Sequence, residues 1–290
     1  MVVLALVIYN SYRQNQKANS LLAKQKREIE LRSNEINQSI NYAKRIQGAL
    51  LPPHSEIKSC FKESFILFAP KDIVSGDFYW FNESKHFYFI AVADCTGHGV
   101  PGSLMSMLGS QLLNDAVEYT QEPGEILKFL NQGVKKSLRQ TADIDSTRDG
   151  MDLILCRFDK NFQSLSFAGA NRPLFLVRMK ELIEYKTTKS AIGGLTSYEQ
   201  IFYQEEISIK SDDCIYLSTD GFADQFGGTK VEFPLIASKK IKSKILKEKL
   251  LEINQESMAA QKESLANFFI TWKGQHEQTD DVLIVGVKIC

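Results

Sequence analysis

Hydrophobic and polar positions divide the chain into a long polar N-terminal stretch and a larger region of short apolar runs. From Ser11 to Leu50 the sequence is rich in Lys, Arg, Glu, Gln and Asn, contains no proline, and has no glycine before Gly48. This composition favours one long helix, and the proline pair at Pro52 and Pro53 is predicted to end it.

One apolar line recurs every seven residues along this predicted helix. Its positions are Leu22, Ile29, Ile36, Ala43 and Leu50. A heptad spacing is typical of a coiled coil, so it predicts a homodimer formed through the helix. An equally good alternative is a helix that packs on its own domain, because the apolar stripe is denser from Ile40 to Leu50.

The first residues form a short apolar segment from Val2 to Tyr9. It is much shorter than the roughly 20 residues that a membrane-spanning helix needs, and it lacks the basic start and small-residue cleavage site of a signal peptide. Two interpretations stay open for residues 1–10: a simple hydrophobic end, or the tail of a membrane helix that begins outside this chain.

After the prolines the chain changes to β-branched and aromatic runs that predict strands. Eight such runs are SFILFAP, HFYFIAVAD, DLILCRFD, SLSFAG, PLFLVRM, QIFYQEEISI, CIYLSTDG and DVLIVGVKI. Helical patterns cover Gly102 to Tyr119, Pro123 to Arg139 and a Lys-rich stretch from Phe233 to Trp272. Blocks of strands followed by paired helices predict an α+β domain, with two sheets forming a sandwich that helices cover.

Composition excludes several classes of protein. The 290 residues are 43% hydrophobic, and 35 basic residues balance 35 acidic ones, so no overall field favours nucleic acid or an anionic membrane. Five scattered cysteines without a C-x-x-C pair fit neither a disulfide framework nor a thiolate zinc site, and they predict a cytoplasmic protein. Membrane association through the N-terminal apolar segment is the alternative.

Aspartates beside glycine mark the ends of several predicted strands. They are Asp77, Asp94, Asp220 and the pair Asp280 and Asp281. A single aspartate before glycine is usually only a turn residue. Four separate strand ends that all offer carboxylates are more simply explained if the carboxylates converge on one site.

Converging carboxylates stay ionised only if a cation neutralises them. Oxygen ligands without His or Cys select the hard ions Mg²⁺ or Mn²⁺. Two such ions that share a bridging carboxylate would activate a water and bind a phosphoryl oxygen. The sequence has no G-x-S-x-G, Walker A or kinase motif, so the pattern favours a metal-dependent phosphoester hydrolase.

The motifs resemble those of the PPM-type metal-dependent serine/threonine protein phosphatases, in their bacterial SpoIIE/RsbU-like branch. The resemblance runs from about Ala43 to the C-terminus. It is carried, in family order, by AKRIQGALLPP, PKDIVSGDFYWF, AVADCTGHGVPGSLMSMLG, GMDLILC, FAGANRPLFLV, STDGFADQFGG and TDDVLIVGV. It implies a β-sandwich with helical layers on both outer faces, two Mn²⁺ or Mg²⁺ ions, and hydrolysis of phosphoserine or phosphothreonine on a protein by a water that bridges the ions.

The resemblance also assigns residues by motif position. Asp77 and Asp94 correspond to core metal ligands, Asp94 as the bridge, and the backbone carbonyl of Cys95 adds another oxygen. Asp220 and Asp280 close the shell of the second ion. Asp280 is preferred to its neighbour because the family's ligand is the first residue of the pair, although the assignment slips to Asp281 if the register differs by one.

Several further residues have both a functional and a structural interpretation. His98 could protonate the leaving seryl oxygen, or it could simply stabilise the turn, which is the commoner role. Lys71 could bind the substrate phosphate or be a solvated lysine. Asp149 and Asp152 stand where a weaker third ion is held in relatives.

These inferences combine into one hypothesis and two alternatives. The hypothesis divides the chain into the apolar segment 1–10, a helical regulatory linker 11–51 and a phosphatase domain 52–290. The domain acts on a signalling phosphoprotein such as an anti-sigma-factor antagonist. An upstream membrane or sensor module regulates it through the linker. One alternative is a catalytically inactive coiled-coil adaptor that binds a phosphoprotein. The other is a phosphoesterase with a non-protein substrate.

Overall fold

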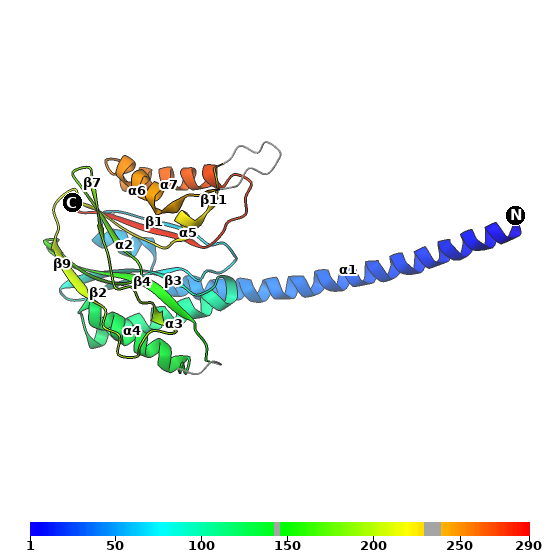
Figure 1. Cartoon of the computed structure of the whole chain (residues 1–290), viewed down its shortest axis with the longest axis horizontal. Helices are drawn as coiled ribbons and strands as arrows, with labels where there is room; N and C mark the ends of the chain where they lie inside the picture. The colour runs from blue at the N-terminus through cyan, green and yellow to red at the C-terminus, as the bar shows by residue number, and fades with distance from the viewer. Residues whose placement is uncertain (142–145, 229–238) are drawn as a thin grey trace. The chain divides into compact units, whose positions relative to one another are not determined.

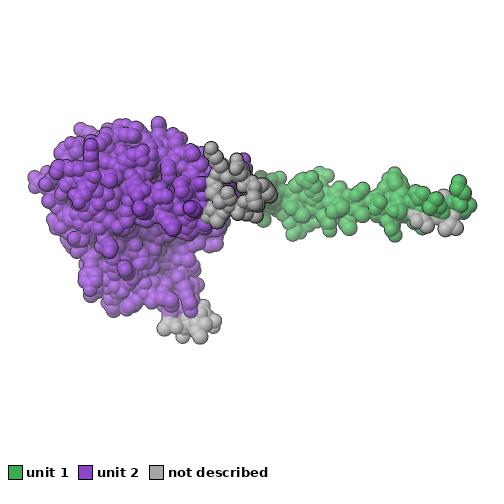
Figure 2. Space-filling view, turned by 45° about the horizontal axis from the view of Figure 1, so that its top comes forward, with its two compact units in different colours: residues 1–45 green, residues 46–290 purple. Residues whose placement is uncertain are grey.

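The computed structural model describes residues 1–141, 146–228 and 239–290 of the chain. They form two compact units, Met1–Arg45 and Ile46–Cys290, which are coloured separately in Figure 2. Helix α1 (Val2–Leu50) supplies the whole of the first unit, and its last turn, from Ile46, belongs to the second. The predicted start of the phosphatase domain, at the first proline of the pair Pro52 and Pro53, stays a prediction.

Helix α1 begins at Val2, so the apolar segment that precedes Ser11 is helical as well. The helix ends at Leu50, where the proline pair was expected to end it. In the described part of the chain, no helix combines the length and the apolar character that a membrane span requires.

The second unit contains two antiparallel sheets that pack face to face (Figure 1). The first sheet has the strand order β1 (Glu63–Ala69), β13 (Val282–Lys288), β10 (Cys214–Ser218), β6 (Leu174–Arg178) and β7 (Glu181–Tyr185). The second has the order β2 (Phe78–Glu83), β3 (Phe87–Cys95), β4 (Gly150–Asp159), β5 (Ser164–Ala170) and β9 (Gln204–Ser208), with the short β8 (Ile192–Gly193) paired to β4.

Alternation along the strands builds the core between the sheets. Ile90 and Val92 of β3 meet Leu217 of β10 and Val285 of β13 in one buried cluster. The residues between them, such as Ala91, point to the opposite face and pack under the helices. The sandwich is therefore buried on both faces of both sheets.

Helices cover the two outer faces, as Figure 1 shows. The second sheet is covered by α3 (Gly99–Tyr119) and α4 (Pro123–Ser137). The first is covered by α6 (Lys242–Ile253) and α7 (Met258–Lys273). The smaller elements are α2 (His54–Cys60), α5 (Gly221–Asp224), β11 (Phe226–Gly227) and β12 (Lys239–Lys240). The predicted α+β sandwich with helical layers is confirmed.

The late helical stretch differs from the prediction. We expected one helix from Phe233 to Trp272, but the structure has two, α6 and α7, separated at residues 254–257. Ser257 ends the break by capping α7, since its hydroxyl oxygen accepts a hydrogen bond from the backbone N–H of Ala260 at 3.3 Å. Residues 233–238 of the predicted helix lie outside the described residues.

Candidate metal centre

Strand register brings three carboxylates together at one end of the second sheet. Asp94 of β3 is paired directly with Asp152 of β4. Asp77 stands immediately before β2, whose first residue Phe78 pairs with Ala93. Like charges on directly opposed residues repel one another, so this register is unfavourable unless a cation lies nearby.

The first sheet contributes two more carboxylates at the same end of the sandwich. Asp220 follows β10 and Asp280 precedes β13, and these two strands are antiparallel neighbours. The end of β10 therefore meets the start of β13, where the Thr219 N–H donates to the Leu283 carbonyl at 3.0 Å. Gly221 makes this approach possible, because a side-chain carbon there would collide with the carbonyl oxygen of Asp281.

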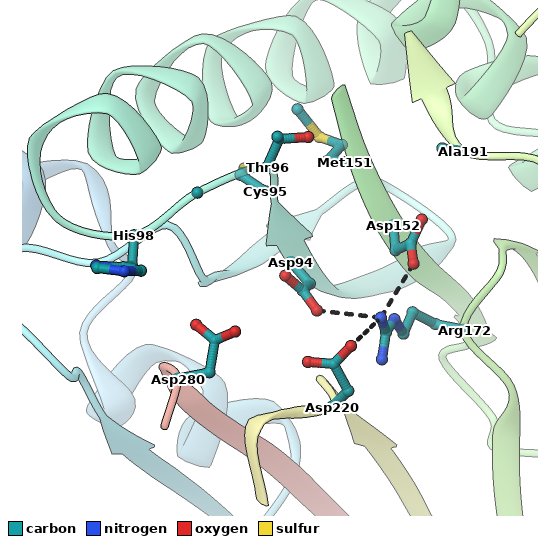
Figure 3. Close-up of a pocket in the computed structure, with 11 residues that line it drawn as sticks. Asp94, Cys95, Thr96, His98, Met151, Asp152, Arg172, Ala191, Asp220 and Asp280 are labelled. Atoms are coloured by element: carbon teal, nitrogen blue, oxygen red, sulfur yellow. Dashed lines mark hydrogen bonds and ion pairs between the residues drawn. The ribbon is translucent and has the colours of Figure 1, made fainter. Parts of the chain in front are cut away.

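The carboxylates of both sheets open into one cavity of about 280 Å³. Its lining comprises Asp94, Cys95, Thr96, Gly97, His98, Met151, Asp152, Arg172, Ala191, Asp220 and Asp280. Figure 3 shows the side chains of Asp94, Asp152 and Asp220 turned toward Arg172, with Asp280 on the side toward His98. Of the predicted ligands, Asp94, Cys95, Asp220 and Asp280 thus share this cavity.

Asp77 is not among the residues that line the cavity. Its side chain is buried, and its Oδ2 atom has no hydrogen-bond partner. Burial, followed by the nearby charge of Asp94, raises the pKa of Asp77 well above its ordinary value. A buried carboxylate oxygen with no hydrogen-bond partner, beside another carboxylate, is expected where the partner of that oxygen is a cation.

Burial and mutual repulsion also destabilise the ionised form of two carboxylates in the lining. Burial and the neighbouring Asp220 raise the pKa of Asp94 to about 8. Burial likewise raises the pKa of Asp280, with Asp220 and Asp281 adding to the effect. The protein has gathered more negative charge at this end of the sandwich than its own groups stabilise.

Arg172 is the cation that the structure places among these carboxylates. Its Nη2 atom lies 2.7 Å from Asp220 Oδ2, 3.0 Å from Asp152 Oδ2 and 3.1 Å from Asp94 Oδ2. Burial alone would lower the pKa of Arg172, but the carboxylates around it raise that pKa. One guanidinium nevertheless offsets only one of the four carboxylates in the lining.

Asp280 and Asp281 have different environments. Asp281 is buried, and its two oxygens accept hydrogen bonds from the backbone N–H groups of Lys71 at 2.7 Å and Gly76 at 2.8 Å. Asp280 faces the cavity instead. Its carboxylate is thus the better placed of the two for a cation in the cavity, which is the preference that the family motif gave.

Cys95, the last residue of β3, and His98, in the turn that follows it, both line the cavity. A side-chain carbon at Gly76 or at Gly102 would collide with the carbonyl oxygen of Gly97, so both glycines are needed for the close packing of this turn. Gly97 itself has a φ of 81°, which glycine adopts without strain. The Cys95 thiol is buried, so a role for this residue falls to its backbone carbonyl.

His98 is held by hydrogen bonds at both ring nitrogens. Nδ1 lies 2.6 Å from Asp72 Oδ2, and Nε2 lies 3.1 Å from Lys71 Nζ. A charged lysine only donates, so this geometry leaves the imidazole proton on Nδ1, facing Asp72. The two bonds position the turn before α3, and one of them joins the Lys71 ammonium to the imidazole. A catalytic role for His98 stays a prediction.

The pair expected to hold a third ion is separated. Asp152 lines the cavity and accepts a hydrogen bond from Asn171 Nδ2 at 2.7 Å. Asp149 is absent from that lining, and its backbone carbonyl accepts a bond from Gln140 Nε2 at 2.6 Å. Only Asp152 is therefore placed to influence ions in the cavity.

The chemistry of these donors fits a hard divalent cation, because they are carboxylate and carbonyl oxygens in strong mutual repulsion. Within the residues that the structure describes, however, no three His, Cys, Asp or Glu side chains form a ready-made metal-binding group. Figure 3 shows that three of the carboxylates, Asp94, Asp152 and Asp220, face the guanidinium of Arg172 instead.

Sequence reasoning missed Arg172 and Asn171, although both lie in the motif FAGANRPLFLV. An arginine has no diagnostic spacing, and its position depends on the register that brings Asn171 beside Leu153 of β4. An Asn-Arg pair at the end of an apolar strand, in a chain with several strand-end aspartates, is the one signal that could have indicated it.

Comparison with known proteins places these features in a family. The model of the family described as Stage II sporulation protein E (SpoIIE) matches residues 84–289. The phosphoserine phosphatase RsbU of Bacillus subtilis (strain 168) is 23% identical over 191 residues, which are 66% of this chain and 55% of RsbU. The chain thus spans about half the length of that relative.

Solved structures share the fold. The SiaA-PP2C domain of Pseudomonas aeruginosa superposes with a TM-score of 0.78 at 31% identity, over 89% of this chain and 98% of that one. The PP2C phosphatase domain of SpoIIE from Bacillus subtilis, with a fragment of its regulatory domain, gives a TM-score of 0.60 at 21% identity, over 78% of this chain and 63% of that one. The second likeness concerns the fold alone.

The family match covers most of the second unit, including the segments that carry Asp94, Asp152, Arg172, Asp220 and Asp280. Together with the shared sandwich, it confirms the resemblance that the motifs carried. The chain therefore belongs to the Stage II sporulation protein E (SpoIIE) family, within the PPM-type phosphatase fold.

Proposed function

We propose that the protein is a metal-dependent protein serine/threonine phosphatase. Two Mn²⁺ or Mg²⁺ ions would be held by Asp77, Asp94, Asp220, Asp280 and the backbone carbonyl of Cys95. The observation that carries the proposal is the convergence of four carboxylates from both sheets in one cavity, together with the buried Asp77, whose Oδ2 atom has no hydrogen-bond partner. Arg172 alone does not balance that charge.

The same charge dictates what the cavity accepts. A phosphorylated side chain carries close to two negative charges at neutral pH, so the carboxylates would repel it unless cations were present. Bound divalent cations lower the pKa of a bound water, which makes it a nucleophile, and they neutralise phosphoryl oxygens. The aspartates would hold such ions, and the strand ends that carry them set where the carboxylates lie.

The substrate class follows from the family. A relative, RsbU, is a phosphoserine phosphatase. We assign this chain a phosphoserine or phosphothreonine on a signalling protein, with a small anti-sigma-factor antagonist as the leading candidate. The cavity is open to solvent at the turn that carries His98, whose side chain is 47% exposed, so a residue on a protein surface could enter.

The N-terminal helix is proposed as the dimerisation and signal-input element. On a single chain its heptad positions are solvent-exposed, with exposed fractions of 61% for Leu22, 67% for Ile29 and 59% for Ile36. A second copy of the same helix would bury this line. An upstream sensor or membrane module would then act through the helix.

The test is phosphate release from a phosphoserine protein substrate across a Mn²⁺ titration, comparing the wild type with Asp94→Asn. We expect metal-dependent release in the wild type and its loss in the variant. Asp115→Asn is the matched control, because Asp115 lies on the exposed face of α3 and bonds only Gln111. Binding of the phosphoprotein without release at any Mn²⁺ concentration would favour the inactive adaptor.

A further inference from the structure

Arg172 is held at the centre of the carboxylates by the backbone around it. Asn171 adopts a φ of 60°, which turns the chain directly after β5. The Asn171 N–H donates to the Thr188 carbonyl at 2.8 Å, and the Arg172 carbonyl accepts from the Thr187 hydroxyl at 2.8 Å. The side chain is therefore presented from a fixed point, and only 15% of it is exposed.

The hydrogen bonds of the guanidinium are unusual for an arginine. Nη2 carries two N–H groups, and these donate to Asp152 at 3.0 Å and Asp220 at 2.7 Å. Asp94 is reached by the same atom as an ion pair at 3.1 Å, with no hydrogen bond to it. Nε is buried and has no partner. Arginine usually binds a carboxylate through two nitrogens at once, so this arrangement gives up the fork geometry.

A fork geometry is present elsewhere in the same protein. Arg178 binds Asp213 through Nε at 2.9 Å and Nη2 at 2.6 Å, as a structural ion pair does. Arg172 instead spreads one nitrogen over three carboxylates from both sheets. Such sharing maximises charge neutralisation rather than specific bonding.

The three carboxylates do not hold Arg172 equally. Asp152 also accepts a hydrogen bond from Asn171, the residue before Arg172. Asn171 and Arg172 therefore each donate to one of its two oxygens. Asp94 and Asp220 have been assigned to the ions. A divalent cation such as Mg²⁺, at its usual distance of about 2.0–2.1 Å from their oxygens, would repel the guanidinium and exclude it from the space it occupies.

We propose that Arg172 is an internal counter-ion of the metal site. It competes with divalent cations for Asp94 and Asp220, and it keeps only its bond to Asp152 when they bind. It partly neutralises the carboxylates before the ions bind, and the free energy needed to displace it lowers the affinity for the ions. This inference rests on the proposed function, since it concerns the same ions.

The test is the binding of Mn²⁺ to the full chain, measured by calorimetry for the wild type and Arg172→Gln. Removal of the competing charge should tighten Mn²⁺ binding about tenfold or more. With EDTA present the variant should melt at a lower temperature than the wild type, because its carboxylates have lost their counter-ion. Mn²⁺ should abolish this difference in melting temperature. Arg178→Gln removes one ion-paired arginine outside the cavity and should leave Mn²⁺ affinity unchanged.

Equal or weaker Mn²⁺ binding by a folded Arg172→Gln would overturn the proposal and assign Arg172 to organising the ligands. Wild-type chain that binds no Mn²⁺ would instead overturn the proposed function. The two failures are distinguishable, because the first requires a wild-type chain that binds Mn²⁺ and the second requires one that does not.

A second measurement is made on the wild type and uses a variant only to assign resonances. In ¹⁵N-labelled wild type, the side-chain resonances of Arg172, assigned by their loss in Arg172→Lys, should shift during a Mg²⁺ titration with the midpoint of Mg²⁺ binding. The resonances of Arg178 should stay in place. Arg172 resonances that stay unchanged while Mg²⁺ binds would show that no displacement occurs, and the proposal would be wrong.

Discussion

Gln47 satisfies both backbone polar groups of Ser75. Its Nε2 donates to the Ser75 carbonyl at 2.6 Å, and its Oε1 accepts from the Ser75 N–H at 3.1 Å. The same Nε2 also lies 2.9 Å from the Ser106 hydroxyl of α3. The last turns of α1 are thus joined to the residue that stands two positions before the predicted ligand Asp77.

Gln47→Ala should destabilise the second unit. The substitution leaves the N–H of the fully buried Ser75 without a partner and its C=O with only the bond from the Ser106 hydroxyl at 3.5 Å, which costs about 1–3 kcal/mol. Denaturant unfolding would measure the loss. Gln16→Ala is the matched control, since Gln16 bonds only the exposed Tyr12 on the same helix and its removal should leave the unfolding free energy unchanged. Equal stability of the two variants would show that the Gln47 bonds are dispensable.

Asp280→Asn and Asp281→Asn should have different effects, although the residues are adjacent. An amide at position 281 would place a donor against the N–H of Lys71 or Gly76, so the melting temperature in EDTA should fall. An amide at position 280 removes a charge that its neighbours disfavour, so that melting temperature should not fall. Mn²⁺ affinity should instead drop at least about tenfold. The reverse result would move the ligand to Asp281.

Much of the architecture was accessible from the sequence, because apolar runs report burial. The runs at 86–94 and 281–289 predicted β3 and β13 within about a residue or two. Five strands were missed, of which β8, β11 and β12 have only two residues each and β2 and β7 are longer. Strand β7 (ELIEY) carries charges at the edge of its sheet, and β2 follows Asp77 so closely that its aromatic residues were taken as part of a motif.

The site was less accessible than the fold. Strand-end aspartates beside glycine could be found because turns and ligands both use that pattern. Which of them converge depends on register, such as the pairing of Asp94 with Asp152, and a sequence does not state its register. Arg172 and Gln47 act through contacts with residues distant along the chain, so no local pattern distinguishes them from other polar residues.

The stability of the protein in EDTA should fall as pH rises from about 4 to about 8. Burial and Asp220 raise the pKa of Asp94 to about 8, from 3.8 in the unfolded chain, so the folded state binds the proton more tightly across this window. Melting temperatures at pH 6 and pH 8 measure the slope, which Asp94→Asn should reduce. Mn²⁺ affinity should change in the opposite sense, because the ions bind ionised carboxylates. A pH-independent Mn²⁺ affinity would contradict this.

Removal of residues 1–40 should convert a dimer into a monomer, as measured by sedimentation. The reason is the exposed heptad line, in which Ile29 is 67% exposed on a single chain and gains burial only against another helix. A single change tests the register: Ile29→Asp should weaken the dimer, whereas Leu31→Asp should not, because Leu31 is similarly exposed at 58% but lies off the line. If the truncated and full chains matched in both association and turnover, the helix would have neither the dimerising nor the regulatory role proposed for it.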